Sequence, residues 1–281
     1  MQKIKLDVIG DPIEHSKSPI IHETVLCSLG LEFEYRKVLV KKGELEGYLD
    51  EVRAKGISGF NLTMPHKKDI IKHLDYIDDE ALLFDSVNTI KVKDGKLFGY
   101  NTDGRGCVQA IFDEGYLIKN KNIVILGAGG VVSTVALKMQ LEGAKKITIL
   151  NRTPISAHAI AEKLNACETY VGSLTTEDIV SAARDCDILI NATPLGMSGI
   201  DADFNDFSFL DALKDGALVY DLIYNPPMTT LLKEAKKRNF NILNGLNMLI
   251  FQGLLADNIF LERSLDFPVL KEKIQTKLKN F

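Results

Sequence analysis

A run of apolar residues that passes directly into a cluster of glycines constrains the fold of this chain more than any other feature. Lys121–Leu126 has the pattern of a buried strand, and an apolar helix that ends near Gly143 follows the cluster. Ile147–Leu150 is expected as the next strand, which gives a βαβ unit of about 30 residues. Glycines at this turn let a phosphate approach backbone N–H groups at the helix N-terminus. The pattern predicts a Rossmann-type dinucleotide-binding domain with cofactor contacts at Gly127, Ala128, Gly129, Gly130 and Val131.

The end of the second strand indicates which dinucleotide is bound. An NAD-binding domain usually carries an acidic residue about 20 residues after the first glycine, where it holds the ribose hydroxyls. Here that position falls in Asn151, Arg152 and Thr153, which include no acid. Arg152 can form a charge-assisted bond to a 2′-phosphate, and Thr153 can add a hydroxyl donor. NADP is therefore favoured over NAD, with a solvated surface arginine as the alternative.

Length and composition narrow the class of protein. The 281 residues suffice for two domains, and the net charge of −4 without a basic run favours neither nucleic acid nor a membrane surface as a partner. No apolar stretch approaches the roughly 18–20 residues that span a bilayer, and the N-terminus lacks the apolar segment of a signal peptide. We expect a cytoplasmic protein. The four cysteines form no CxxC pair, so we expect no metal site and no disulfide framework.

The N-terminal part alternates between strand and helix patterns. Strands are expected at Ile4–Gly10, Phe33–Val40 and Gly59–Thr63. The helices between them are expected to begin at Ser18, as an N-cap before Pro19, at Gly43 and at about His66. This rhythm is typical of a mostly parallel α/β sheet.

Two further segments complete the domain assignment. Asn88–Val92 and Lys96–Tyr100 flank Asp94-Gly95, which predicts a β-hairpin. A strongly apolar helix is expected from Met248 to Leu261. Together these patterns predict an α/β protein with two domains.

Polar clusters occupy the loops of the first domain. They are residues 15–19 (HSKSP), 61–67 (NLTMPHK), 86–89 (SVNT) and 101–104 (NTDG). The loops after the carboxyl ends of parallel strands gather at one edge of the sheet and form the ligand crevice. Hydroxyls, amides, one lysine and one carboxylate suit a polyhydroxylated, anionic small molecule.

These clusters carry a resemblance to a known family. The series HSKSP, NLTMPHK, VNT, NTDG, GAGG, NRT, NATPLGM and GLNML…Q resembles shikimate dehydrogenase, motif by motif and in order, over nearly the whole chain. That family reduces 3-dehydroshikimate to shikimate with NADPH, and its substrate lies in the cleft between two α/β domains. The resemblance implies an NADP-dependent oxidoreductase of aromatic amino-acid biosynthesis. It also implies a substrate-binding and catalytic domain of residues 1–103 with 246–281, and a Rossmann NADP-binding domain of residues 104–245.

Carried over by motif, the resemblance implies roles for individual residues. Ser16 and Ser18 would hold the substrate carboxylate, while Thr63, Asn88 and Gln252 would bind ring hydroxyls. The paired serines favour shikimate over quinate, because quinate/shikimate dehydrogenases often replace one of them with threonine.

The resemblance also implies a catalytic pair, Lys67 and Asp103, and Tyr224 as a residue that closes over the substrate. Hydride delivery to a ketone leaves a developing alkoxide, which a positioned cation can stabilise and protonate. Lys67 can do both. Further contacts near the nicotinamide would come from Thr193, Met197 and Gly245.

Some positions depart from the family pattern. Val131 and Val132 replace small residues, Ser133 replaces a common basic residue, and Asn247 stands in a motif that usually reads G-x-G-M-L. No second basic residue follows the NRT motif. These changes leave cofactor selectivity less settled than substrate class. A quinate/shikimate dehydrogenase that uses NAD or NADP and a non-catalytic metabolite-sensing paralogue stay open as alternatives, as do monomer and homodimer.

Overall fold

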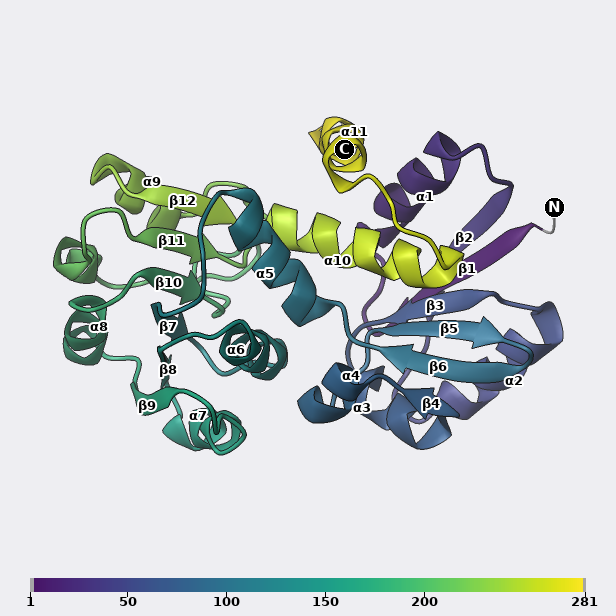
Figure 1. Cartoon of the computed structure of the whole chain (residues 1–281), viewed down its shortest axis with the longest axis horizontal. Helices are drawn as coiled ribbons and strands as arrows, with labels where there is room; N and C mark the ends of the chain where they lie inside the picture. Colours follow the sequence, from purple (N-terminus) through teal and green to yellow (C-terminus); the bar gives the residue numbers. More distant parts are fainter. Residues whose placement is uncertain (1–2, 280–281) are drawn as a thin grey trace. The chain divides into compact units, whose positions relative to one another are not determined.

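Two β-sheets organise the chain, and each belongs to its own α/β unit (Figure 1). The structure is a computed structural model and describes residues 3–279. The first unit comprises Met1–Gly106 with Ile250–Phe281, and the second comprises Cys107–Leu249. The division falls within two helices, α5 (Asp103–Asp113) and α10 (Gly245–Leu261).

The first unit contains a six-stranded mixed sheet with the order β2-β1-β3-β5-β6-β4. β1 pairs in parallel with β2 and β3, and β4 pairs in parallel with β6, whereas β5 is antiparallel to both of its neighbours. The strands are β1 (Ile4–Gly10), β2 (Phe33–Leu39), β3 (Gly59–Leu62), β4 (Tyr76–Ile77), β5 (Thr89–Lys93) and β6 (Lys96–Tyr100).

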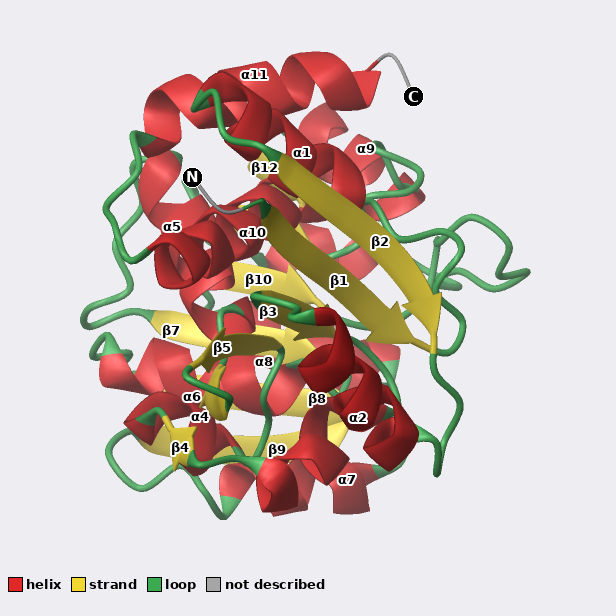
Figure 2. Cartoon of the chain, turned by 90° about the vertical axis from the view of Figure 1, so that its right-hand side faces the viewer, coloured by secondary structure: helices red, strands yellow, loops and turns green. Residues whose placement is uncertain are grey.

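Helices cover this sheet and complete its core. They are α1 (Ser18–Ser28), α2 (Leu45–Lys55), α3 (His66–Asp69), a 3₁₀ turn (Ile70–His73), α4 (Asp79–Phe84) and α11 (Phe267–Lys279). The C-terminal helix α11 packs beside α1 (Figure 2). α2 ends at Gly56, whose left-handed backbone (φ 62°) is the usual helix stop. Its apolar side, including Tyr48 and Val52, is buried in one core with Phe60 of β3.

Strand direction in the first unit brings the polar loops together. β1, β3 and β6 run the same way, because β5 is antiparallel to both β3 and β6. The loops after these three strands therefore lie at one edge of the sheet. β5 runs the opposite way, so the residues that precede Thr89 lie at that same edge.

The second unit is an all-parallel, six-stranded sheet with the order β12-β11-β10-β7-β8-β9. Its strands are β7 (Asn122–Leu126), β8 (Lys146–Asn151), β9 (Glu168–Ser173), β10 (Ile188–Asn191), β11 (Leu218–Asp221) and β12 (Asn241–Asn244). The connections contain α6 (Val132–Leu141), α7 (Pro154–Ala161), α8 (Thr176–Ala183), a 3₁₀ turn (Ser208–Ala212) and α9 (Thr230–Lys237). The predicted Rossmann-type arrangement is confirmed, with β7 beside β8 and β10.

The apolar runs Asp187–Asn191 and Ala217–Asp221 predict β10 and β11, whereas β4, β9 and β12 were not expected from the sequence. All three lie at sheet edges. An edge strand is half exposed, so its apolar residues are few, and every residue of β9 is exposed or half-buried. The prediction of Ser18 as an N-cap is wrong, because Lys17 occupies the N-cap position, without a side-chain capping bond, and Ser18 is already helical. The expected helix from about His66 divides into α3 and the 3₁₀ turn.

Candidate active site

Lys67 and Asp103 meet in the first unit. Lys67 lies in α3, just after β3, and Asp103 begins α5, just after β6. The ammonium Nζ of Lys67 donates to Oδ2 of Asp103 at 2.7 Å, and the two side chains are 27% and 12% exposed. Each residue thus follows a strand whose carboxyl end lies at the shared edge. The pair combines a partly exposed cation, available to an incoming ligand, with a carboxylate that orients it.

A buried amide holds the other oxygen of that carboxylate. Asn88 directly precedes β5, and its Nδ2 donates to Oδ1 of Asp103 at 2.9 Å. Asn101 accepts from the backbone N–H of Asp103 through its Oδ1 at 3.0 Å. Thr102 donates its backbone N–H to Oδ1 of Asn88 at 2.9 Å. Both carboxylate oxygens therefore have fixed partners, and the position of Asp103 is determined by the loop on either side of the hairpin.

The remaining substrate-binding residues predicted in this unit lie on three elements. Ser16 and Ser18 flank the start of α1 and are half-buried, and Oγ of Ser16 accepts from the backbone N–H of Ser18 at 3.3 Å. Thr63 follows β3 and donates its backbone N–H to Ile9 at 2.9 Å. Gly10 leaves room for Thr63, because a Cβ at Gly10 would lie 2.3 Å from Cγ2 of Thr63. Gln252 is half-buried on α10.

In the second unit, the glycine turn between β7 and α6 forms an open cradle. A Cβ at Gly129 or Gly130 would meet no atom within 4 Å, and both glycines are exposed. The N-cap of α6 is Val131, which makes no side-chain capping bond, and the N–H of Val132 donates to the carbonyl of Gly129 at 2.9 Å. A helix N-terminus without a side-chain cap can receive an anion. Ser133 adds a buried hydroxyl that has no partner among the described residues. These features fit the pyrophosphate of a dinucleotide.

Gly127 is the first glycine of this turn and has little space around it. Its φ is +108°, and a Cβ there would lie 2.9 Å from the carbonyl oxygen of Ala192. Its N–H donates to the carbonyl of Leu150 at 2.7 Å. Only glycine meets both requirements, the positive φ and the close approach.

We therefore expect the Gly127→Ala variant to lose about 2 kcal/mol of unfolding free energy, because alanine is strained at positive φ and would press on Ala192. Thermal unfolding measures this loss. Gly129→Ala is the matched control, since its added methyl group has open space and its melting temperature should stay near that of the wild type. Equal melting temperatures for the two variants would contradict this account of Gly127.

The strand after α6 presents the residues predicted to select the cofactor. Asn151 ends β8, and its Nδ2 donates to the carbonyl of Thr153 at 2.9 Å. Arg152 and Thr153 are exposed, and Thr153 is the N-cap of α7 without a side-chain capping bond. A guanidinium and a hydroxyl at the end of this strand are free to contact a 2′-phosphate.

The loops after β10 and β11 hold the other predicted residues, and a buried network fixes them. Asp221 accepts from Nδ2 of Asn191 at 3.0 Å, from the hydroxyl of Thr229 at 2.6 Å and from the N–H of Ile223 at 3.1 Å. Asn191 in turn accepts through Oδ1 from the hydroxyl of Thr193 at 2.7 Å. Burial raises the pKa of Asp221. The network ties both loops to the ends of their strands.

Three more predicted site residues lie in the second unit, of which two are exposed and one is crowded by its neighbours. Met197 and Tyr224 are each 38% exposed on these loops. Partial burial raises the pKa of Tyr224 above the usual tyrosine value. Gly245 begins α10, and a Cβ there would lie 1.9 Å from the carbonyl oxygen of Leu222, so no larger residue fits.

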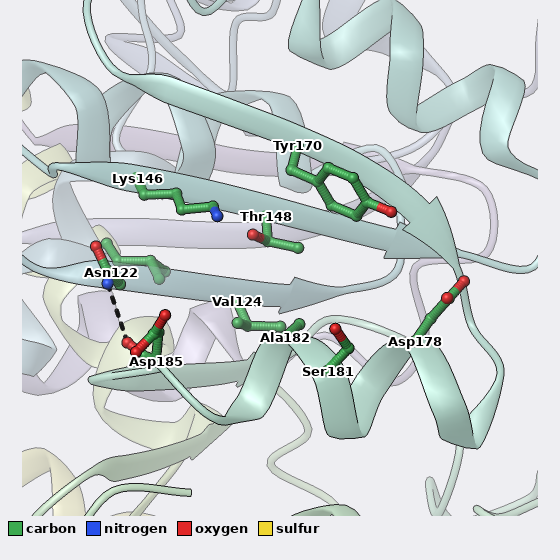
Figure 3. Close-up of a pocket in the computed structure, with 10 residues that line it drawn as sticks. Asn122, Val124, Lys146, Thr148, Tyr170, Asp178, Ser181, Ala182 and Asp185 are labelled. Atoms are coloured by element: carbon green, nitrogen blue, oxygen red, sulfur yellow. Dashed lines mark hydrogen bonds between the residues drawn. The ribbon is translucent and has the colours of Figure 1, made fainter. Parts of the chain in front are cut away.

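A separate pocket of about 260 Å³ lies in the second unit over β7, β8 and β9 (Figure 3). Thr148, Tyr170 and Asp178 are among its lining residues, and none of the predicted site residues is. Among residues 3–279, no group of three or more His, Cys, Asp or Glu residues could hold a metal ion. No helix in that same range is long and apolar enough to cross a membrane.

Comparison with known proteins identifies the family to which this chain belongs. The family model described as the shikimate dehydrogenase substrate binding domain matches residues 8–90, and the model described as shikimate / quinate 5-dehydrogenase matches residues 107–198. A shikimate dehydrogenase (NADP(+)) from Methanocaldococcus jannaschii is 42% identical over 97% of this chain and 96% of its own. The chain belongs to the shikimate dehydrogenase family.

Two solved structures are similar to this member of the shikimate dehydrogenase family over nearly its full length. The shikimate 5-dehydrogenase of Listeria monocytogenes, solved with shikimate and NAD, is 31% identical, with a TM-score of 0.89 over 96% of each chain. The 5-ketofructose reductase of Gluconobacter is 30% identical, with a TM-score of 0.87 over 98% of this chain and 99% of its own. The same fold therefore also occurs in a protein that is named as a reductase of 5-ketofructose.

Several residues of this shikimate dehydrogenase family member were not singled out from the sequence. Asn61, Thr89 and Thr102 lie in the quoted motifs and are buried beside Asn88. Asp221 and Thr229 belong to the buried network that fixes the loops after β10 and β11. Burial of polar side chains is the signal that identifies them, and burial is visible only once the strands are paired.

Proposed function

We propose that this protein is a shikimate dehydrogenase that catalyses the reversible, NADPH-dependent reduction of 3-dehydroshikimate to shikimate. The observation that carries the proposal is the Lys67–Asp103 pair, with Nζ 2.7 Å from Oδ2, in the unit that matches the substrate-binding family model. The relative from Methanocaldococcus jannaschii supports the same activity, since it is named shikimate dehydrogenase (NADP(+)).

The chemistry assigned to the pair follows from its geometry. Bound NADPH supplies the hydride to the ring ketone. Lys67 stabilises the oxygen as negative charge develops and gives it a proton, while in the reverse direction it receives that proton from the hydroxyl. Asp103 holds the ammonium by one oxygen and is itself held by Asn88 through the other. The carboxylate thus orients Lys67 throughout.

The remaining polar residues of the first unit are assigned to substrate binding. Ser16 and Ser18 bind the carboxylate, and Thr63, Asn88 and Gln252 bind the ring hydroxyls. Hydroxyl and amide groups recognise such oxygens by donating and accepting in turn. Tyr224, on the loop after β11, is assigned a contact with the substrate, for which its neutral hydroxyl is suited.

The cofactor residues of the second unit are assigned from the cradle and the end of β8. Gly127, Ala128, Gly129, Gly130 and Val131 receive the pyrophosphate. Asn151, Arg152 and Thr153 receive the adenosine ribose and its 2′-phosphate, whereas Thr193, Met197 and Gly245 lie on the nicotinamide side. Arg152 is the residue that favours NADP over NAD.

A second candidate activity is oxidation of quinate, or use of NAD, because one matching family model covers both substrates and a similar enzyme was solved with NAD. The test compares initial rates of absorbance change at 340 nm for shikimate and quinate, each with NADP and with NAD. The main proposal expects the highest kcat/KM for shikimate with NADP. Preference for quinate or NAD would move the assignment to the second candidate. Cofactor binding without turnover would indicate a metabolite sensor.

A further inference from the structure

A buried chain of hydrogen bonds runs from β2 to the catalytic carboxylate. The hydroxyl of Tyr35 lies 3.1 Å from Oδ1 of Asn61, and Nδ2 of Asn61 lies 3.1 Å from Oγ1 of Thr89. Oγ1 of Thr89 lies 2.9 Å from Oδ1 of Asn88, whose Nδ2 lies 2.9 Å from Oδ1 of Asp103. Asn61, Thr89 and Asn88 are 6%, 0% and 3% exposed. We call this sequence of five residues the carboxylate chain.

The orientation of the Asn88 amide is determined by its neighbours. The backbone N–H of Thr102 can only donate, and it lies 2.9 Å from one terminal atom of Asn88, which must therefore be the oxygen. The other terminal atom is the NH₂ group, and it faces the acceptor Oδ1 of Asp103. A flipped amide would set oxygen against the carboxylate and NH₂ against the Thr102 N–H.

The same argument orients Asn61. The backbone carbonyl of Asn88 can only accept, and it lies 3.4 Å from Nδ2 of Asn61. Oδ1 of Asn61 therefore faces Tyr35, whose hydroxyl must donate. Burial raises the pKa of Tyr35 well above its usual range, which keeps that hydroxyl protonated. Because Thr89 accepts from Asn61, its own proton goes to Asn88, and every donor in the carboxylate chain points toward Asp103.

We infer that Asn61 and Thr89 are positioning residues for the reaction, which hold the amide of Asn88 with its N–H on Asp103 and so keep the second carboxylate oxygen on Lys67. This inference rests on the proposed function. Neither side chain carries an assigned substrate contact, and both lie on neighbouring strands, paired across β3 and β5 at Asn61 and Thr89.

Thr89→Val tests the inference, because valine keeps the shape of threonine and removes the hydroxyl that donates to Oδ1 of Asn88 beside the Thr102 N–H. We expect kcat/KM for shikimate to fall about 10-fold, because the buried amides of Asn61 and Asn88 each lose a hydrogen-bond partner. The KM for NADP should stay unchanged. Thr89→Ser restores the hydroxyl and should recover activity to within about 3-fold. Tyr35→Phe removes the first donor of the chain and should give a smaller loss in the same direction.

Thr24→Val is the matched control, since Thr24 is also buried in the first unit but its hydroxyl, among residues 3–279, donates only to the carbonyl of Ile20 in its own helix. Its kcat/KM should match the wild type. The inference is overturned if Thr89→Val keeps wild-type kcat/KM, if Thr24→Val loses as much, or if Thr89→Ser restores nothing.

Two readouts separate this inference from the proposed function. Wild-type turnover of shikimate tests the function, and the ratios between variants test the inference on whichever substrate the wild type uses. Crystal structures of the wild type and of Thr89→Val test it without turnover. Loss of the Asn88–Asp103 contact in the variant supports the inference, and an unchanged contact contradicts it.

Discussion

Replacing Lys67 by methionine is expected to lower kcat for shikimate oxidation by roughly 10²–10⁴-fold, the range of general acid–base catalysis by a positioned side chain. Methionine retains the length and the apolar stem of lysine but has no proton to exchange and no charge to set against the alkoxide. Steady-state kinetics with shikimate and NADP measure the effect, and thermal unfolding confirms that the variant folds.

The neighbouring Lys68 provides a matched control for this prediction. It lies in the same short helix, its side chain is 74% exposed, and it pairs with Asp85 at 2.6 Å. Lys68→Met removes the same charge one residue away, so its kcat should remain within about 2-fold of the wild type. A similar loss in both variants would show that general electrostatics, and not the Lys67–Asp103 pair, supports catalysis.

Arg152→Ala is expected to raise KM for NADP by about 10–100-fold while leaving KM for NAD unchanged. A charge-assisted hydrogen bond contributes about 1.5–3 kcal/mol, and only NADP carries the 2′-phosphate that accepts it. Initial rates with varied NADP and varied NAD at saturating shikimate measure both constants.

Arg184→Ala is the control for the cofactor prediction, because Arg184 is another exposed arginine of the second unit, at the end of α8. It should leave both constants unchanged. Equal increases in KM for NADP and NAD in Arg152→Ala would place Arg152 outside the 2′-phosphate site and leave NADP selectivity to other residues.

The sequence predicted the elements whose local residue pattern matches their burial or turn geometry in the structure. β7, with four consecutive buried residues, and the hairpin turn at Asp94-Gly95, where both residues have positive φ, were recognisable without a structure. The edge strands β4, β9 and β12 were not, because half-exposed strands have no continuous apolar run. Ser18 was misplaced as a helix cap, since the choice between neighbouring residues at a helix start depends on the loop before it.

The residues of the candidate site likewise divide into those that local sequence predicts and those that it does not. The glycine turn and Arg152 could be inferred from local spacing, because strand, turn and helix are consecutive in the chain. Lys67 and Asp103 were paired through resemblance to the family, since nothing local joins residues 36 positions apart. Asn61 and Thr89 lie within strands, where a polar residue commonly faces solvent. Their inward direction becomes visible only when β3 is paired with β5.

The most direct test of the central claim is oxidation of NADPH by the wild-type protein in the presence of 3-dehydroshikimate, followed at 340 nm with chromatographic detection of the product. The account predicts rapid loss of absorbance and formation of shikimate in an amount equal to the NADPH consumed. Tight NADPH binding with no consumption, or consumption that yields no shikimate, would contradict the assignment.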